Sequence, residues 1–463
     1  MKPNVYWFRT DLRVHDNLAL AAAAANGPVI GLYIATPQQW QSHDDAPIKL
    51  DFWRRQLLLL QDSLAEHDIP LVCCETPDYN AIPAVIEEII DTWGAGGIYF
   101  NREYPLNESR RDAAVTFVCD ELGVPVHAFD DSVLMKPGSI LNNSGEPFRV
   151  FTPFSRKARQ IIGPMDQSAP TLPAKAGAGK PAKLQTQLPL ASLSWPEAHD
   201  HWASLWPAGE KEARKRLEDF CQHRITAYKD QRDLPAVDGT SKLSAWLNAG
   251  IISIRECWRT ASAWNDGNGV ETWKNELLWR EFYKHIMVHY PHVSMARPFR
   301  DDYGHVPWRD DEEQFRAWCE GCTGIPLVDA AMRQLRETGW MHNRLRMVTA
   351  MFLSKNLLID WRMGEQLFMQ HLVDGDFSAN NGGWQWSAST GTDAVPYFRV
   401  FNATTQSRRF DANGDFIRQF VPELASLDNK AIHEPGAARP ANYPAPLVDL
   451  KATRARALEA FKR

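Results

Sequence analysis

The stretch VYWFRTDLRVHDNLALAAAAANGPVIGLYIA, residues 5–35, decides the fold. A short apolar run at 5–8 is followed by polar residues, and an alanine-rich segment leads to a second apolar run at 29–34. This order predicts a strand, a helix capped by Asp16 or Asn17, and a second strand. Further apolar runs at 69–74, 97–100 and 124–129 are separated by helical segments at 49–66, 81–92 and 109–122. The alternation indicates an α/β domain with a doubly wound, mainly parallel five-stranded sheet.

Sheets of this kind bind ligands at the carboxyl ends of their strands. No GxGxxG follows the first strand, where Arg9-Thr10-Asp11-Leu12-Arg13 stands instead, so a dinucleotide at the usual position is disfavoured. Other polar side chains follow strand ends, and their spacing alone favours loop and helix-cap roles: His43, Asn101, Glu103, Asn107 and Glu108.

The composition is that of a globular protein with more than one domain. The chain has 463 residues, of which 44% are hydrophobic and 23% charged, and this length predicts two or three domains. A formal net charge of −6 argues against non-specific coating of nucleic acid but allows a local basic face. Seven scattered cysteines, no signal-peptide pattern and no long apolar run predict a cytoplasmic protein with reduced thiols, no bound metal and no membrane span.

A low-complexity segment at 163–196, rich in Pro, Ala, Gly and Lys, predicts a linker between domains. Beyond it helical periods prevail, at 210–224, 275–289, 326–337, 343–358 and 363–372. We therefore expect an α/β domain at 1–130, a linker at 131–200 and an all-α domain at 201–463.

Three stretches of the helical half combine polar and aromatic side chains. GTSKLS at 239–244 places hydroxyls at a helix start, where free N–H groups can bind phosphate, although a simple N-cap role is favoured on this signal alone. WKNELLWREFY at 273–283 puts Glu276, Trp279, Arg280 and Tyr283 on one helix face, which suits a flat ligand. In GWMHNRLRM at 339–347 the two arginines diverge, so that one could pair with a buried carboxylate such as Asp374.

The stretch DGDFSANNGGWQWSASTGTDAVPYFRVFN at 374–402 has no long apolar run and no clear helical period. We interpret it as an irregular loop that forms the floor of a cofactor pocket. None of these stretches contains a nucleophile motif, a general-base dyad or a metal cluster. Rings, amides and arginines suit an aromatic cofactor that carries the chemistry while the protein positions it.

Several of these segments resemble signature segments of the photolyase and cryptochrome flavoproteins, namely RTDLRVHDN (9–17), GTSKLSAWL, WKNELLWREFY, TGWMHNRLRM and DGDFSANNGGWQWSASTGTDA. They are most similar to the bacterial class I photolyases that repair cyclobutane pyrimidine dimers, from near Tyr6 to beyond Arg418. The resemblance implies an N-terminal antenna domain, a helical domain that holds FAD in a folded form, and double-stranded DNA with pyrimidine dimers as substrate. We also expect a monomer.

The resemblance carries over a set of FAD-binding positions, in which Asn380 matches an amide beside flavin N5 and Arg346 with Asp374 matches a charge pair beside the ring. This set is Tyr228, Thr240, Ser241, Lys242, Leu243, Ser244, Trp273, Arg280, Asn343, Arg346, Asp374, Gly375, Asp376 and Asn380. The positions implied for DNA contact comprise the dimer pocket (Glu276, Trp279, Asn343, Met347, Trp386) and the arginines that face phosphates (Arg232, Arg280, Arg344, Arg399).

The activity implied is a light-driven carbon–carbon lyase reaction. An electron passes from excited reduced FAD to a dimer flipped out of the duplex, the dimer splits, and the electron returns. Glu276 and Asn380 match residues that assist this chemistry. Trp384, Trp361 and Trp308 match a chain that carries electrons to FAD, although core packing would also explain buried tryptophans.

His43, Asn107 and Glu108 match residues that hold a methenyltetrahydrofolate antenna, and a deazaflavin antenna is the alternative. The main rival function is a cryptochrome-type blue-light receptor without repair activity; against it stand Glu276, Trp279, Met347 and Trp386. A photolyase for 6-4 photoproducts is disfavoured because Asn343 stands where such enzymes tend to have a second histidine after His342.

Overall fold

The computed structural model describes residues 1–163, 168–264, 267–301 and 306–462, and residues 164–167 of the predicted linker lie outside the described residues. Its internal contacts divide the chain into two units. Unit 1 comprises Met1–His223 and Ser241–Pro291, and unit 2 comprises Arg224–Thr240 and His292–Arg463. The domain boundaries expected at 130 and 200 stay a prediction.

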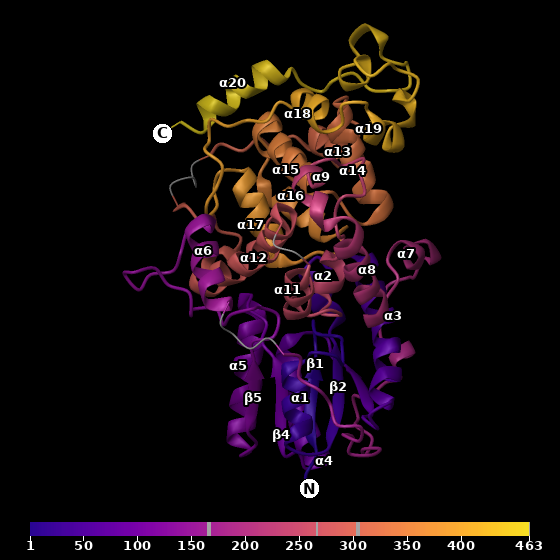
Figure 1. Cartoon of the computed structure of the whole chain (residues 1–463), viewed down its shortest axis with the longest axis vertical. Helices are drawn as coiled ribbons and strands as arrows, with labels where there is room; N and C mark the ends of the chain where they lie inside the picture. The colour runs from indigo at the N-terminus through magenta and orange to yellow at the C-terminus, as the bar shows by residue number, and fades with distance from the viewer. Residues whose placement is uncertain (164–167, 265–266, 302–305, 463) are drawn as a thin grey trace. The chain divides into compact units, whose positions relative to one another are not determined.

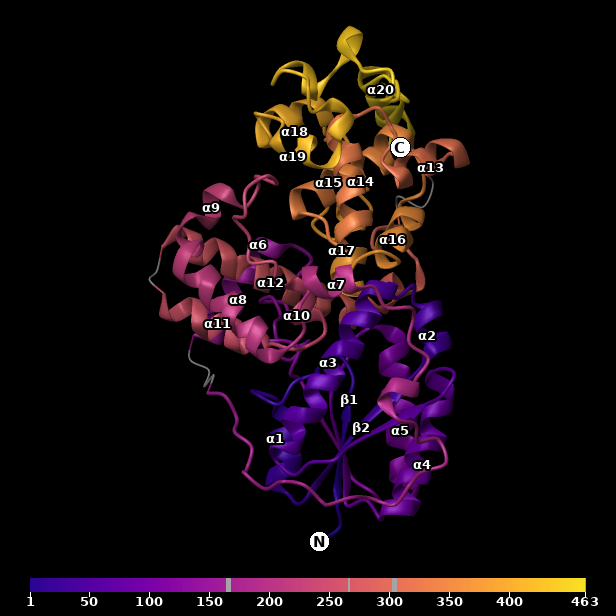
Figure 2. The ribbon, with the colours of Figure 1, turned by 90° about the vertical axis from the view of Figure 1, so that its right-hand side faces the viewer.

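Unit 1 contains the expected five-stranded parallel sheet, in the order β3-β2-β1-β4-β5. Helix α1 lies on one side of the sheet and helices α4 and α5 on the other (Figure 2). The central strands read as continuous apolar runs because both faces are covered. The strands are β1 (Asn4–Phe8), β2 (Val29–Ala35), β3 (Leu71–Glu75), β4 (Gly97–Asn101) and β5 (Val126–Phe129).

The first helix begins where the sequence predicts. The side chain of Asn17 accepts a hydrogen bond from the backbone N–H of Leu20 and so caps α1. Unit 1 contains the helices α1 (Leu18–Ala25), α2 (Pro37–Ser42), α3 (Pro47–Ala65), α4 (Ile82–Trp93), α5 (Leu106–Glu121), α6 (Phe151–Ile162), α7 (Asp200–Leu205), α8 (Glu210–His223), α10 (Ser244–Asn248), α11 (Ile254–Ala263) and α12 (Asn268–His289) (Figure 1).

The signature segment 9–17 forms a buried network of charges. Asp16 is fully buried and accepts hydrogen bonds from Ser253 Oγ at 2.5 Å and from Arg255 Nη2 at 3.0 Å, both near the start of α11. Asp131 pairs with Arg13 at 2.5 Å and with Arg255 at 2.7 Å. These ion pairs fasten the first loop of the sheet to α11, so the segment holds unit 1 together.

Unit 2 is helical, and a large apolar core that includes Trp318, Trp361 and Trp384 lies among its helices. Helix α15 continues directly into a π-helical segment, Phe352–Leu357, which ends at Leu358 with a φ of 58°. The helices are α9 (Tyr228–Gln231), α13 (Glu312–Glu320), α14 (Pro326–Thr338), α15 (Asn343–Met351), α16 (Trp361–Met369), α17 (Phe377–Ser387), α18 (Ala403–Phe410), α19 (Asp415–Phe420) and α20 (Leu450–Ala460).

The interpretation of 374–402 as an irregular loop is wrong for its first half. Residues Phe377–Ser387 form α17, and the Asp376 side chain caps it by accepting from the Ala379 N–H at 3.1 Å. The two central glycines lower the helix propensity, but burial of Asn380, Asn381 and Trp384 overrides this local preference.

Candidate functional site

In unit 1, helix α12 presents the predicted row of ligand-facing residues. Trp279 is half-buried, and its ring stacks on that of Phe151 with centroids 3.7 Å apart and planes 7° apart. Glu276 lies about one turn earlier and is also half-buried. The two terminal guanidinium nitrogens of Arg280 donate to backbone carbonyls, Nη1 to Ser132 at 2.6 Å and Nη2 to Leu247 at 3.2 Å. Arg280 therefore ties α12 to its surroundings, and its role toward DNA or FAD stays a prediction.

The structure brings only part of the GTSKLS segment into contact with another predicted FAD-binding residue. Ser244 begins α10, as predicted, but no side chain caps this short helix. Ser241 Oγ accepts from the indole N–H of Trp273 at 3.3 Å, so two predicted FAD-binding residues of unit 1 lie in contact. Lys242 adopts a φ of 51°, and Leu243 is buried. Thr240 belongs to unit 2.

In unit 2 the predicted pairing of Arg346 with Asp374 is confirmed. Arg346 Nη2 donates to both carboxylate oxygens of Asp374, at 3.0 and 2.8 Å, and Asp374 is buried. Arg344 diverges from Arg346, as expected, but it too has a carboxylate partner, Asp233, at 2.8 Å. Two neighbouring residues predicted to line the dimer pocket lie on the same helix: Asn343 is exposed and Met347 is half-buried.

Arg232 and Tyr228 lie together in unit 2. The Arg232 guanidinium lies 5.7 Å from the centroid of the Tyr228 ring, and Arg232 Nε is 3.8 Å from Asp233. Asp233 thus connects two arginines that the resemblance assigns to DNA phosphates. A shared carboxylate can hold such arginines in place before a phosphate arrives.

Helix α17 holds Asn380 and the two tryptophans of the WQW motif. The Asn380 amide nitrogen donates to the Glu365 carbonyl at 2.9 Å, which fixes the orientation of its side-chain amide. Trp384 and Trp386 are two positions apart, so they project about 200° apart around the helix. Trp384 is buried, and its indole N–H has no hydrogen-bond partner among the residues that the structure describes, whereas Trp386 is half-buried. The two rings therefore occupy different environments, as the resemblance implies.

The predicted tryptophan chain lies in and beside the core of unit 2. Trp384 and Trp361 are both buried in it, and Trp308 packs against it while half-buried. Gly364 leaves room for this arrangement, because a Cβ there would lie 2.1 Å from the Trp384 ring. Sequence reasoning missed Trp318, whose buried ring lies 6.0 Å from that of Trp384. Its helical segment carries no motif that could have indicated this.

The loop that follows α17 carries Arg399, which is exposed. The buried Lys355 of the π-helical segment donates to Ser389 Oγ at 2.8 Å and to the Arg399 carbonyl at 3.0 Å. Burial, with a smaller contribution from the Arg399 guanidinium, lowers the pKa of Lys355 to about 7. Lys355 therefore helps to hold this loop against the core.

The three predicted antenna residues come together in unit 1. His43 Nε2 lies 3.0 Å from the amide nitrogen of Asn107, and His43 Nδ1 lies 3.5 Å from Glu108 Oε1. Sequence reasoning missed two neighbours: the Gln39 amide nitrogen is 2.8 Å from His43 Nε2, and the Tyr79 ring meets His43 edge-on. Burial raises the pKa of Glu108, although His43 opposes the effect.

At the carboxyl ends of β1 and β4 the chain itself provides the polar groups. Arg9 Nη1 pairs with Asp112 at 2.5 Å, and Arg111 pairs with Glu103 at 2.8 Å. Burial alone would raise the pKa of Glu103, but Arg111 and then Arg9 outweigh it and hold the value at about 2. Asn101 donates to Asp11 Oδ2 at 2.8 Å. This ion-pair network occupies the usual ligand position of the fold.

Within the described ranges, no three His, Cys, Asp or Glu side chains gather closely enough to hold a metal ion. Among the helices that the structure describes, none has the length and apolar character needed to cross a membrane.

The donors present suit a flavin nucleotide. A flavin ring offers carbonyl oxygens and ring nitrogens, and a guanidinium–carboxylate pair with an oriented amide can hydrogen-bond to both kinds of atom. Arg346, Asp374 and Asn380 provide this set in unit 2, while the hydroxyls of Ser241 and Ser244 in unit 1 suit phosphate.

Comparisons with known proteins agree with this chemistry. Residues 4–175 match the family model described as DNA photolyase, and residues 273–463 match the FAD binding domain of DNA photolyase. The chain is 46% identical to the deoxyribodipyrimidine photo-lyase of Salmonella typhimurium, with 100% of this chain and 99% of the relative covered.

Solved structures show the same architecture. A bacterial class III photolyase from Agrobacterium tumefaciens superposes with a TM-score of 0.87 at 35% identity, covering 100% of this chain and 97% of that one. A cryptochrome from Synechocystis superposes with a TM-score of 0.88 at 27% identity, covering 99% of each chain. The fold is thus common to a photolyase and a cryptochrome, and of these two the photolyase has the higher identity to this chain. The chain belongs to the DNA photolyase family.

Proposed function

We propose that this protein repairs cyclobutane pyrimidine dimers in double-stranded DNA, using blue or near-ultraviolet light and bound FAD. The observation that carries this proposal is the 46% identity, over the full chain, to a deoxyribodipyrimidine photo-lyase. The residues implied for the dimer pocket are all present, which favours repair over a receptor function.

FAD, when bound, supplies the light-excited electron donor, and no metal is needed for that chemistry. Our candidates for holding the flavin ring are Arg346, Asp374 and Asn380 of unit 2, and our candidates for binding phosphate are Ser241 and Ser244 of unit 1. The ion pair between the half-buried Arg346 and the buried Asp374 presents a fixed hydrogen-bonding edge before any ligand arrives.

We assign recognition of the dimer to Trp279, Trp386, Glu276, Asn343 and Met347. A dimer must leave the base stack, which costs a few kcal/mol, and stacking on indole rings returns about 1–3 kcal/mol per base. The Glu276 carboxylate and the Asn343 amide can hydrogen-bond to the polar edges of the bases.

Binding to the DNA backbone has to be local because the whole chain carries a formal charge of −6. Arg232, Arg344 and Arg399 are our candidates for phosphate contacts. Asp233 pairs with Arg344 at 2.8 Å, so phosphate would compete with this carboxylate for the guanidinium.

We propose that the protein is a cytoplasmic monomer. For the antenna we propose methenyltetrahydrofolate, bound at His43, Asn107 and Glu108. The ion pairs of Arg9 and Arg111 occupy the usual ligand position of the fold at the carboxyl ends of β1 and β4, which favours a site at His43 instead. His43→Ala protein should lose the pigment's absorbance and keep that of the flavin. A deazaflavin spectrum in the wild type would contradict the folate assignment.

Two measurements test the cofactor and the substrate. The absorption spectrum of the purified protein should show bound flavin, and a duplex with one thymine dimer should outcompete the same undamaged duplex. Trp279→Ala should weaken binding of the dimer duplex only, whereas Trp202→Ala on α7, a position with no assigned role, should leave it unchanged. Equal affinity of the wild type for both duplexes would refute the substrate assignment.

A further inference from the structure

Trp279 of α12 belongs to an aromatic cluster that the chain supplies from two helices. Phe151, the first residue of α6, covers one face of the indole, with centroids 3.7 Å apart and an interplanar angle of 7°. Phe282 meets the indole edge-on at 5.8 Å, and the Tyr283 ring lies tilted at 5.6 Å. A flat ring has two broad faces, and Phe151 covers one of them. The half-buried state of Trp279 agrees with this arrangement.

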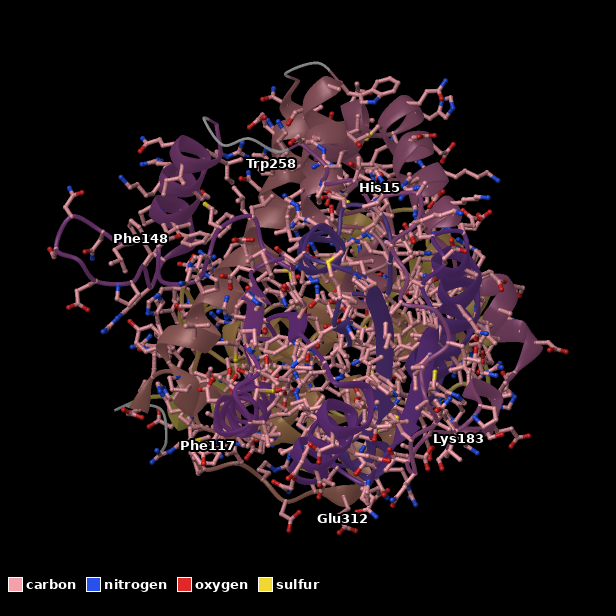
Figure 3. The ribbon with its side chains drawn as sticks, turned by 90° about the horizontal axis from the view of Figure 1, so that it is seen from below. His15, Phe117, Phe148, Lys183, Trp258 and Glu312 are labelled. Carbon is pink, nitrogen blue, oxygen red and sulfur yellow. The ribbon has the colours of Figure 1, made fainter. Side chains whose placement is uncertain are left out.

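Helix α6 is pinned to α12 at more than one point, and the two helices lie side by side (Figure 1). Phe151 is buried at the N-terminal end of α6, and near the other end Arg159 Nη2 donates to Asn275 Oδ1 at 3.0 Å. The Arg159 guanidinium also lies 5.7 Å from the Trp258 ring, which is labelled in Figure 3. Phe151 is therefore held by its helix, independently of the ring it covers.

The ring of Phe154, one turn further along α6, provides a natural comparison. It packs against Phe282 at 5.1 Å and His285 at 5.2 Å, and Phe148, labelled in Figure 3, meets it edge-on at 6.4 Å. Only 1% of the surface of Phe154 is exposed, so it is a core residue. Its ring contacts Phe148, Phe282 and His285. Phe151 is the ring of α6 that stacks on Trp279.

We propose that Phe151 is a positioning residue for dimer recognition: it covers one face of Trp279 and holds the indole in place, so that a flipped-out pyrimidine dimer stacks on the other face. This inference rests on the proposed function. A preorganised ring loses little conformational freedom when the ligand binds, so the stacking energy contributes to affinity rather than to ordering the side chain. Linear and branched side chains at 151 would leave Trp279 free to change rotamer.

The test compares Phe151→Leu, Phe151→Tyr and Phe154→Leu, each with bound FAD. Affinities are measured for a fluorescein-labelled duplex with one thymine dimer and for the same duplex without it. An aromatic pair is worth about 0.5–1.5 kcal/mol beyond buried area, which corresponds to about 2- to 12-fold in affinity. Phe151→Leu should lower the ratio of the affinity for dimer duplex to that for undamaged duplex by this factor. Phe151→Tyr, which keeps the ring, should have the wild-type ratio. Phe154→Leu should keep the wild-type ratio despite its loss of core packing.

A double-mutant cycle separates positioning from general structural damage. In the Trp279→Ala background, Phe151→Leu should change the affinity ratio no further, because the residue acts through the indole. Phe151→Met, which retains more of the buried volume, serves the same test if the leucine variant loses FAD. The rate of repair at saturating dimer DNA should stay unchanged while the dimer concentration needed for half-maximal rate rises.

The inference is overturned if Phe151→Leu and Phe151→Met keep the wild-type ratio, or if Phe154→Leu lowers it equally. A further loss in the Trp279→Ala background would also overturn it. Absence of dimer preference in the wild type would refute the proposed function together with this inference, whereas preference in the wild type with an unaffected Phe151→Leu refutes the inference alone.

Discussion

Lys355 offers a quantitative test of the structure, because a buried cation makes stability depend on pH. Its side chain is fully buried, and burial with the nearby Arg399 guanidinium lowers its pKa from 10.5 to about 7. At ~1.36 kcal/mol per pKa unit, this difference corresponds to about 5 kcal/mol. The contacts to Ser389 Oγ and to the Arg399 carbonyl offset only part of the cost of burying the charge.

The two pKa values of Lys355, in the folded and the unfolded chain, determine whether the free energy of unfolding rises or falls with pH. Between pH 7 and 10.5 the unfolded chain binds a proton on this lysine and the folded chain does not. Stability therefore rises with pH across this window; the penalty is complete below pH 7 and absent above pH 10.5. Lys355→Met lacks the titrating group and keeps similar volume, so its stability has no such dependence.

The assay is urea denaturation of the wild type and Lys355→Met at pH values from 7.5 to 9.5, followed by tryptophan fluorescence. The free energy of unfolding of the wild type, minus that of the variant, should increase by about 1.4 kcal/mol per pH unit. Lys451→Met, at an exposed position of α20, should follow the wild type at every pH. If the difference in free energy of unfolding between the wild type and Lys355→Met stays constant with pH, the lysine does not carry the buried charge inferred here.

Two further predictions concern the tryptophan chain and the ion pairs of the sheet. Trp308→Phe should prevent light from reducing oxidised FAD but spare repair once the flavin is reduced chemically; lost repair in the pre-reduced variant would contradict a role confined to electron supply. Glu103→Gln should destabilise unit 1 by about 3 kcal/mol at neutral pH, because Arg111 and Arg9 hold the pKa of Glu103 at about 2 instead of 4.5. The charge of Glu103 stabilises the fold above pH 4.5 and ceases to do so as the pH falls through 2, so thermal unfolding curves of variant and wild type should converge there.

Much of the α/β part could be predicted from the sequence because its signals are local. The Asn17 cap and the buried apolar runs depend on neighbouring residues, and the observed strands fall within two residues of the predicted ones. The divergence of Arg344 and Arg346 along their helix predicted that one of them could pair with Asp374, and the resemblance indicated that it is Arg346.

Other features depend on tertiary contacts that no local pattern contains. Helix α17 forms although it includes two glycines, since burial of Trp384 and Asn380 outweighs propensity. Phe151 meets Trp279 across 128 positions of sequence, and Lys355 meets the Arg399 carbonyl across 44. Such contacts follow from how helices pack, so the partners of Trp279 and the fastening of the Arg399 loop appear only in the folded chain.

Light should drive repair of the dimer through this protein's bound flavin. The most direct measurement is the number of thymine dimers left in a defined duplex after incubation with the purified protein, its flavin reduced, under blue light and in darkness. We predict that dimers disappear in the lit sample alone and that intact thymines are restored. Equal numbers of dimers in lit and dark samples, with the flavin still reduced, would show that this protein does not repair dimers by light.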